Sequence, residues 1–117
     1  EEQTDEAKDV SKENTLSFSI TAQNEVMLND KPVAVEDIRG RIVDFVRMRG
    51  AQHLILVDAN PASDYNTYFT LENEIVAAYA ELRNAEAKRR YHRDYARCTD
   101  EQRKKVRANY PQHLSET

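Results

Sequence analysis

The chain has 117 residues, of which 39% are hydrophobic and 32% are charged, and its formal net charge at pH 7 is -4. This composition is typical of one soluble domain with polar extensions, and no stretch approaches the roughly 20 apolar residues that would cross a bilayer. The single cysteine, Cys98, excludes an internal disulfide and a thiolate metal site.

The first 14 residues, EEQTDEAKDVSKEN, are acidic and have neither aromatic side chains nor a regular apolar period. Such a composition cannot form a packed core and is typical of a solvated linker. We therefore expect residues 1–14 to be an acidic linker.

A strand and a hairpin are predicted next. In LSFSIT, residues 16–21, apolar residues alternate with serine and threonine, as in a strand with one buried face. In EVMLNDKPV, residues 25–33, the Asn29-Asp30 pair is a turn signal and predicts a short hairpin. Because Pro32 lacks a backbone N–H, the second arm is expected at an edge of the sheet.

A helix and a strand follow the hairpin. From Val35 to Val46 the apolar residues recur at helical spacing, and Gly50 supplies a stop. HLILVD, residues 53–58, is a continuous apolar run that predicts a central strand buried on both faces. This order favours a right-handed crossover between two parallel strands.

The strongest helical periodicity runs from Tyr68 to Ala85. Ser63 can cap this helix, or the Asn-Pro pair at 60–61 could open it a turn earlier. An unbroken helix as far as Cys98 would be about 50 Å long, whereas a compact domain of this size is about 35 Å across. We therefore expect the second half of the helix to overhang the domain.

The tail predicts another helix, because TDEQ, residues 99–102, has the form of a capping box. Together the elements predict an α+β fold, a two-layer sandwich in which a small mixed sheet, in β-β-α-β-α order, has helices on one face. The domain would span residues 15–84, followed by a charged helical extension over 85–117. Whether QHLSE, residues 112–116, completes the sheet stays open.

The segment VDANPASDYNTYFTLENE, residues 57–74, is the best place to look for a catalytic site, since α/β folds often place catalytic groups after a parallel strand. His53 begins the strand and Asp58 ends it, about 16 Å away, so the pair cannot cooperate. His92 and His113 lack the spacing of metal ligands, and no glycine-rich phosphate loop is present. We therefore expect no enzymatic activity, no cofactor and no metal.

Aromatic side chains in the same segment have a structural interpretation. Tyr65, Tyr68 and Phe69 are expected to anchor the first turns of the long helix on the sheet.

The first strand offers a binding hypothesis. At a sheet edge, its unpaired backbone groups could bind an extended peptide; a linker or a second copy of the domain could equally cover that edge. The candidate partner-binding residues are Ser17, Phe18, Ser19, Ile20 and Thr21.

The stretch from residue 85 to residue 107 is rich in lysine and arginine. It can be a solvated helix face, a docking surface for an acidic partner or anionic lipid, or a nucleic-acid site. Nucleic acid is the least expected of these, because the chain is acidic overall and acids interrupt the run. The residues of this basic tail surface are Lys88, Arg89, Arg90, Arg93 and Arg97.

The order of these elements, with LNDKPV in the hairpin and DYNTYFTLENEI opening the long helix, resembles the soluble domain of the ExbD/TolR family from about Leu16 to Leu82. The resemblance is closest to an ExbD-like subgroup with an extended tail, in which a Tyr-x-x-Tyr pair leads into a segment like ENEIVAAYAELRN. The tail motif YPQHLSE is also similar. The matching residues are Tyr65, Tyr68, Glu72, Asn73, Glu74, Ala78, Tyr79, Glu81, Leu82, Arg83, Tyr110, Pro111 and Ser115.

The resemblance implies a periplasmic domain of a single-pass inner-membrane protein, with the acidic linker joining it to a transmembrane helix outside this chain. Such proteins join an ExbB-like proton channel and pass the energy of the proton gradient to a TonB-like protein, which opens outer-membrane transporters. The family's essential acid for proton conduction lies in the transmembrane helix, so no residue here inherits that role.

For this chain the resemblance implies a homodimer that captures an extended TonB-like segment at a sheet edge. A TolR-like domain associated with peptidoglycan is the alternative within the family, and a nucleic-acid module using the basic tail is the alternative from another class. The commoner ExbD pattern has a glycine-containing turn and a closing strand after Leu82, where this chain has charged helices.

Overall fold

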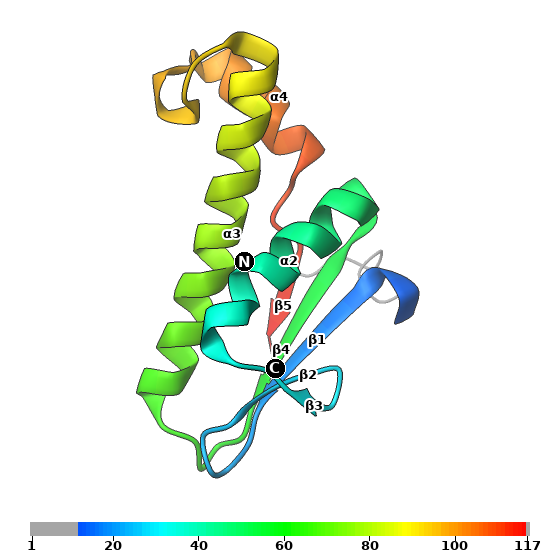
Figure 1. Ribbon diagram of the computed structural model, residues 1–117, viewed down its shortest axis with the longest axis vertical. Helices are drawn as coiled ribbons and strands as arrows, with labels where there is room; N and C mark the ends of the chain where they lie inside the picture. The colour runs from blue at the N-terminus through cyan, green and yellow to red at the C-terminus, as the bar shows by residue number, and fades with distance from the viewer. Residues whose placement is uncertain (1–11, 117) are drawn as a thin grey trace.

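The computed structural model describes residues 12–116, so most of the predicted acidic linker lies outside the described residues. A mixed sheet of five strands, in the order β3-β2-β1-β4-β5, packs against two helices, α2 and α3, in the predicted α+β fold (Figure 1). The strands are β1 (Thr15–Ile20), β2 (Val26–Leu28), β3 (Lys31–Pro32), β4 (Leu54–Ala59) and β5 (Leu114–Glu116). The helices are α2 (Val35–Arg49), α3 (Tyr65–Tyr91) and α4 (Asp100–Asn109), with short 3₁₀ turns η1 (Lys12–Asn14), η2 (Gly50–Gln52) and η3 (Tyr95–Arg97).

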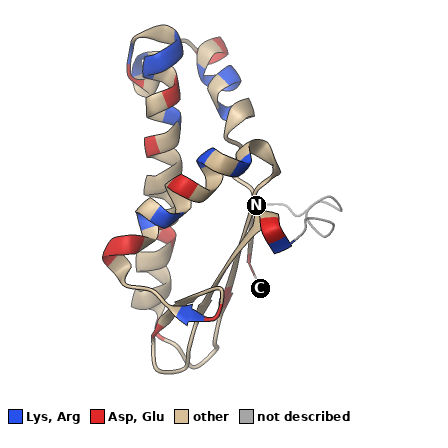
Figure 2. Ribbon diagram, turned by 45° about the vertical axis from the view of Figure 1, so that its right-hand side comes forward, with Lys and Arg blue, Asp and Glu red and all other residues tan. Residues whose placement is uncertain are grey.

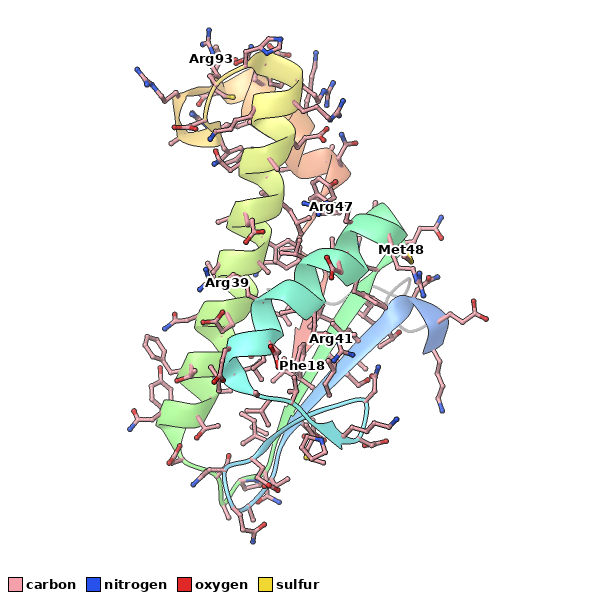
Figure 3. All side chains as sticks on the ribbon, in the orientation of Figure 1. Phe18, Arg39, Arg41, Arg47, Met48 and Arg93 are labelled. Carbon is pink, nitrogen blue, oxygen red and sulfur yellow. The ribbon has the colours of Figure 1, made fainter. Side chains whose placement is uncertain are left out.

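β1 lies in the middle of the sheet and contributes every second residue to the core. Leu16, Phe18 and Ile20 are at most 3% exposed, as the alternation in the sequence predicts (Figure 3). β1 is antiparallel to β2 and parallel to β4, and Phe18 lies opposite Val57 of β4. The predicted parallel pairing of these two strands is therefore confirmed.

The predicted hairpin connects β2 to β3. Asn29 and Asp30 both have positive φ, 49° and 68°, which is the geometry of a type I′ turn. The Asn29 side chain also accepts a hydrogen bond from the backbone of Ser17, at 3.0 Å. β3 is the outermost strand on this side, as Pro32 predicts.

α2 begins and ends where the sequence predicts. Ile38, Ile42 and Val46 are fully buried, and Gly50 takes a φ of 63°, which favours glycine at the end of a helix. Val35 was expected on the same apolar face, and it lines a cavity together with Ile38. As the first residue of the helix it is 42% exposed.

The cap of α3 lies one residue after the predicted cap, Ser63. Asp64, not Ser63, accepts a hydrogen bond from Thr67 N–H, at 2.8 Å. The helix then runs to Tyr91 and ends at His92, which adopts a left-handed φ of 58°. Its 27 residues span about 40 Å, so its second half overhangs the sheet as expected, but it does not continue unbroken to Cys98 (Figure 1).

The overhanging half of α3 packs on α4, and we call these parts, with the turn between them, the helical extension (residues 85–109). Thr99 and Gln102 form the predicted capping box, and α4 ends before Pro111. The chain then returns to the sheet, where β5 pairs parallel to β4. QHLSE therefore does complete the sheet, and the extension predicted over 85–117 is helical only as far as Asn109.

Candidate functional site

β5, rather than β1, presents a strand edge on the side of the sheet next to α3. β1 pairs with β2 on one side and with β4 on the other, so the prediction that Ser17, Phe18, Ser19, Ile20 and Thr21 form an edge strand is wrong. The side of β1 that was predicted to be unpaired is occupied by the parallel strand β4. The outermost strands of the described sheet are β3 and β5.

The backbone of β5 is oriented by its ladder with β4. Leu114 lies opposite Ile55, and the Ile55 N–H donates to the carbonyl of His113 at 2.9 Å. Because backbone groups alternate in direction along a parallel strand, the N–H and C=O groups of Leu114 and Glu116 point away from β4. Within residues 12–116, β5 has a neighbouring strand on one side only.

An aromatic stripe on α3 flanks this edge. Tyr65 and Phe69, one helical turn apart, stack with ring centroids at 5.8 Å, and Val76 follows on the same flank of the helix. These three side chains are 69%, 50% and 54% exposed. The neighbouring Tyr68 contacts Glu116 of β5, so the first turns of α3, which carry Tyr65 and Phe69, lie beside β5.

The predicted anchoring role holds for one of the three aromatic residues. Tyr68 packs against the apolar core and donates a hydrogen bond from its hydroxyl to Glu116 Oε1, at 2.5 Å. Tyr65 and Phe69 were expected to anchor the helix on the sheet, and that expectation is wrong. Both side chains lie on a flank of α3 that turns away from its buried face, which Leu71 and Ile75 form, so their rings remain largely exposed.

Two carboxyl groups meet beside Tyr68. Glu72 lies one turn after Tyr68 on α3, and Glu116 reaches it from β5. Burial, and next the contact with Glu116, raise the pKa of Glu72 to about 7. The same contact lowers the pKa of Glu116, and the hydrogen bond to Glu116 raises the pKa of Tyr68. Two carboxyls with pKa values shifted apart in this way share one proton near neutral pH.

A buried histidine cluster supports the segment that leads into β5. His53 is fully buried; its Nδ1 lies 2.6 Å from the Gly50 carbonyl and its Nε2 lies 2.5 Å from the Tyr79 hydroxyl. Nδ1 must therefore carry the hydrogen, and Nε2 accepts from Tyr79. His113 in turn has its Nδ1 3.2 Å from the His53 carbonyl. This cluster joins β4, α3 and the C-terminal segment.

The basic tail surface lies far from this edge, at the distal end of the helical extension (Figures 2 and 3). Lys88 pairs with Asp94, while Arg89 and Arg90 pair with Glu86. Arg93 and Arg97 are exposed and form no ion pair with any residue between 12 and 116. The surface is thus partly neutralised by its own acids.

The other candidate sites offer few groups that could bind a ligand or catalyse a reaction. A cavity of about 310 Å³ opens between the hairpin and the first turns of α2 and α3, and its one ionisable lining residue is Glu25. Within the described part of the chain, no group of three or more His, Cys, Asp or Glu side chains is arranged to hold a metal ion. Asp58 is exposed, whereas His53 is buried.

Sequence reasoning missed Glu72, Glu116, His53 and Tyr79 as interacting groups. No local motif joins them. The contact between Glu72 and Glu116 depends on β5 lying beside β4, and the contact between His53 and Tyr79 depends on how α3 packs against the segment before β4. The segment YPQHLSE has Leu114 as its one aliphatic residue and is too short to show the period of a strand, so the sequence carries no clear signal of these contacts.

None of the helices among residues 12–116 combines the length and apolar character that crossing a bilayer requires. Neither the scan against protein-family models nor the search of curated proteins matches this chain to a known family or protein.

Proposed function

We propose that this chain is the periplasmic coupling domain of an ExbD-like inner-membrane energiser, and that it binds an extended segment of a TonB-like protein along the outer edge of β5. In that role it transmits the energy that an ExbB-like channel draws from the proton gradient. The domain binds rather than catalyses. The observation that carries the proposal is an edge strand flanked by exposed aromatic side chains.

The β5 edge supplies both parts of a peptide-binding surface. The backbone groups of Leu114 and Glu116 point outward and can form a ladder with an added strand. Alternate side chains of that strand would face α3, where Tyr65, Phe69 and Val76 offer apolar contact. A row of exposed apolar groups on one helix flank is typical of an interaction site.

The opposite edge is less suited to strand addition. β3 has two residues, and one of them is Pro32, which has no N–H to donate. The other is Lys31, and lysine on an edge strand opposes pairing with a further strand. The proposed partner therefore adds at β5.

The test is an NMR titration of the ¹⁵N-labelled chain with overlapping peptides that tile the periplasmic linker of the TonB-like protein from the same genome. We expect one peptide to shift the amide signals of Leu114 and Glu116 and those around Phe69. Phe69→Ser should weaken binding about tenfold, because it removes apolar contact. Met48→Ser, on α2, is the matched control for loss of an exposed apolar side chain.

Three results would contradict the proposal. Shifts confined to the basic tail surface would indicate an acidic partner there. Sedimentation of the chain with peptidoglycan sacculi, without peptide binding at β5, would favour the TolR-like role. Binding to DNA or RNA that falls steeply with salt would favour the nucleic-acid alternative.

A further inference from the structure

The carboxyl pair Glu72–Glu116 stands at the edge where the partner strand is proposed to add. Glu72 Oε2 is buried, and within the described stretch from Lys12 to Glu116 no N–H or O–H group donates a hydrogen bond to it. Among residues 12–116, neither Glu72 nor Glu116 forms an ion pair with a lysine or arginine. A buried carboxylate oxygen without a donor is unstable unless a proton or a cation approaches it.

If a strand of the partner adds to β5, one of its side chains would lie next to the Glu72–Glu116 pair. Glu116 projects from β5 toward α3, since it contacts Tyr68. In a strand added to β5, the residue paired with Glu116 projects to the same face of the sheet. That side chain would lie beside Glu116 and Glu72, with the exposed rings of Tyr65 and Phe69 close by.

We propose that the segment captured at β5 carries a lysine or arginine, and that its cation binds between Glu72 and Glu116. This inference rests on the proposed function of the β5 edge. The cation provides the donor that Glu72 Oε2 lacks and balances two acids that form no ion pair with a lysine or arginine between residues 12 and 116. Aromatic rings on the same flank add a favourable environment for a positive charge.

Binding of the cation should release the proton that the two carboxyls share. The titratable groups that act on Glu72 are Tyr68 from its own helix and Glu116 from β5. Because the pKa of Glu72 is raised to about 7, the pair is protonated below that pH and competes with the cation. Affinity for a basic peptide is therefore expected to increase as the pH rises from 5.5 to 8.

The test uses three end-blocked heptapeptides of alternating valine and threonine that differ at the central residue, which is arginine, citrulline or glutamate. Citrulline keeps the shape of arginine without its charge. Binding to the ¹⁵N-labelled chain is measured by NMR at pH 5.5 and pH 8. At pH 8 we expect the arginine peptide to bind about tenfold more tightly than the citrulline peptide, as a charge-assisted hydrogen bond provides.

Two variants test whether Glu72 and Glu116 cause the preference for the arginine peptide. Glu72→Gln and Glu116→Gln keep the size of each side chain and should each abolish most of the preference for arginine. Glu81→Gln, an exposed acid on the same helix, is the matched control and should leave the preference unchanged. Unchanged amide spectra of the free variants show that each one folds.

The outcomes separate the two proposals. Equal binding of the arginine and citrulline peptides at β5 would overturn the cation site and leave the edge proposal standing. A preference for arginine that survives in both Glu→Gln variants would also overturn the cation site. Absence of any shift at Leu114 and Glu116 with all three peptides would overturn both.

Discussion

The sheet domain and the helical extension are stabilised in different ways, although α3 runs through both. The sheet domain has a continuous apolar cluster of 17 buried residues drawn from four strands and two helices. The extension has three small buried residues, Ala87, Cys98 and Val106, with Tyr91 and Tyr95 packed against them. Burial of apolar area is therefore the main stabilising contribution in the first region and a small one in the second.

Directional polar contacts take the place of a large core in the extension. Glu86, 7% exposed, accepts hydrogen bonds from Arg89 at 3.0 Å and from Asn109 at 2.7 Å. Arg83 donates to the Tyr110 carbonyl from two guanidinium nitrogens. These contacts join α3 to the C-terminal end of α4 and to Tyr110, which follows it. Because the apolar core of the extension is small, we expect the extension to open while the sheet domain stays folded.

The largest effect is expected from a cavity in the sheet domain. Phe18→Ala should reduce the free energy of unfolding by about 3–5 kcal/mol, because Phe18 is 1% exposed in the centre of the core. Urea denaturation measures this loss. Met48→Ala, at a side chain that is 77% exposed (Figure 3), should change stability by less than about 0.5 kcal/mol. Equal effects of the two substitutions would contradict the assigned core.

Acidification tests the buried histidine cluster, which belongs to the sheet domain. Burial lowers the pKa of His53 to about 4, so the unfolded chain binds a proton between pH 6.5 and 4 that the folded chain excludes. This contribution to stability is present above pH 6.5 and is lost as the pH falls. We expect a loss of about 2 kcal/mol between pH 7 and pH 4.5.

Glu72 titrates in the opposite direction, because its raised pKa favours the folded state at low pH. The measurement is therefore best made in the Glu72→Gln background, by urea denaturation at both pH values. Adding His53→Gln, which has no titrating group, should flatten the pH dependence. A pH dependence that persists in the double variant would assign the effect to another group.

The smallest effect is expected in the extension. Glu86→Ala should destabilise it locally by about 1–2 kcal/mol, because Asn109 and two arginines lose their acceptor. Hydrogen exchange should become faster in α4 and η3, while amides of β1 and β4 keep their protection. The matched control is Glu81→Ala, at an exposed acid of the same helix. Uniformly faster exchange would show that the two regions unfold together.

Local chemistry predicted several elements closely. Asn29-Asp30 predicted the turn of the hairpin, Gly50 the end of α2, and Thr99 with Gln102 the capping box. Each depends on residues within a few positions of one another. The edges of the sheet and the contacts between distant segments were not predicted. β1 lies inside the sheet rather than at its edge, and Tyr65 and Phe69 are exposed rather than packed on the sheet.

By itself the sequence determined where the helices and most strands form, because hydrogen-bond caps, turn dihedrals and apolar periods act over a few residues. Tertiary structure alone decided which strand is outermost and which acids meet. The segment Leu114–Glu116 is too short to be recognised as a strand from its sequence, and it forms one because it pairs with β4. The same pairing brings Glu116 to Glu72 and leaves an edge beside the aromatic stripe, because long-range contacts are set by how elements pack.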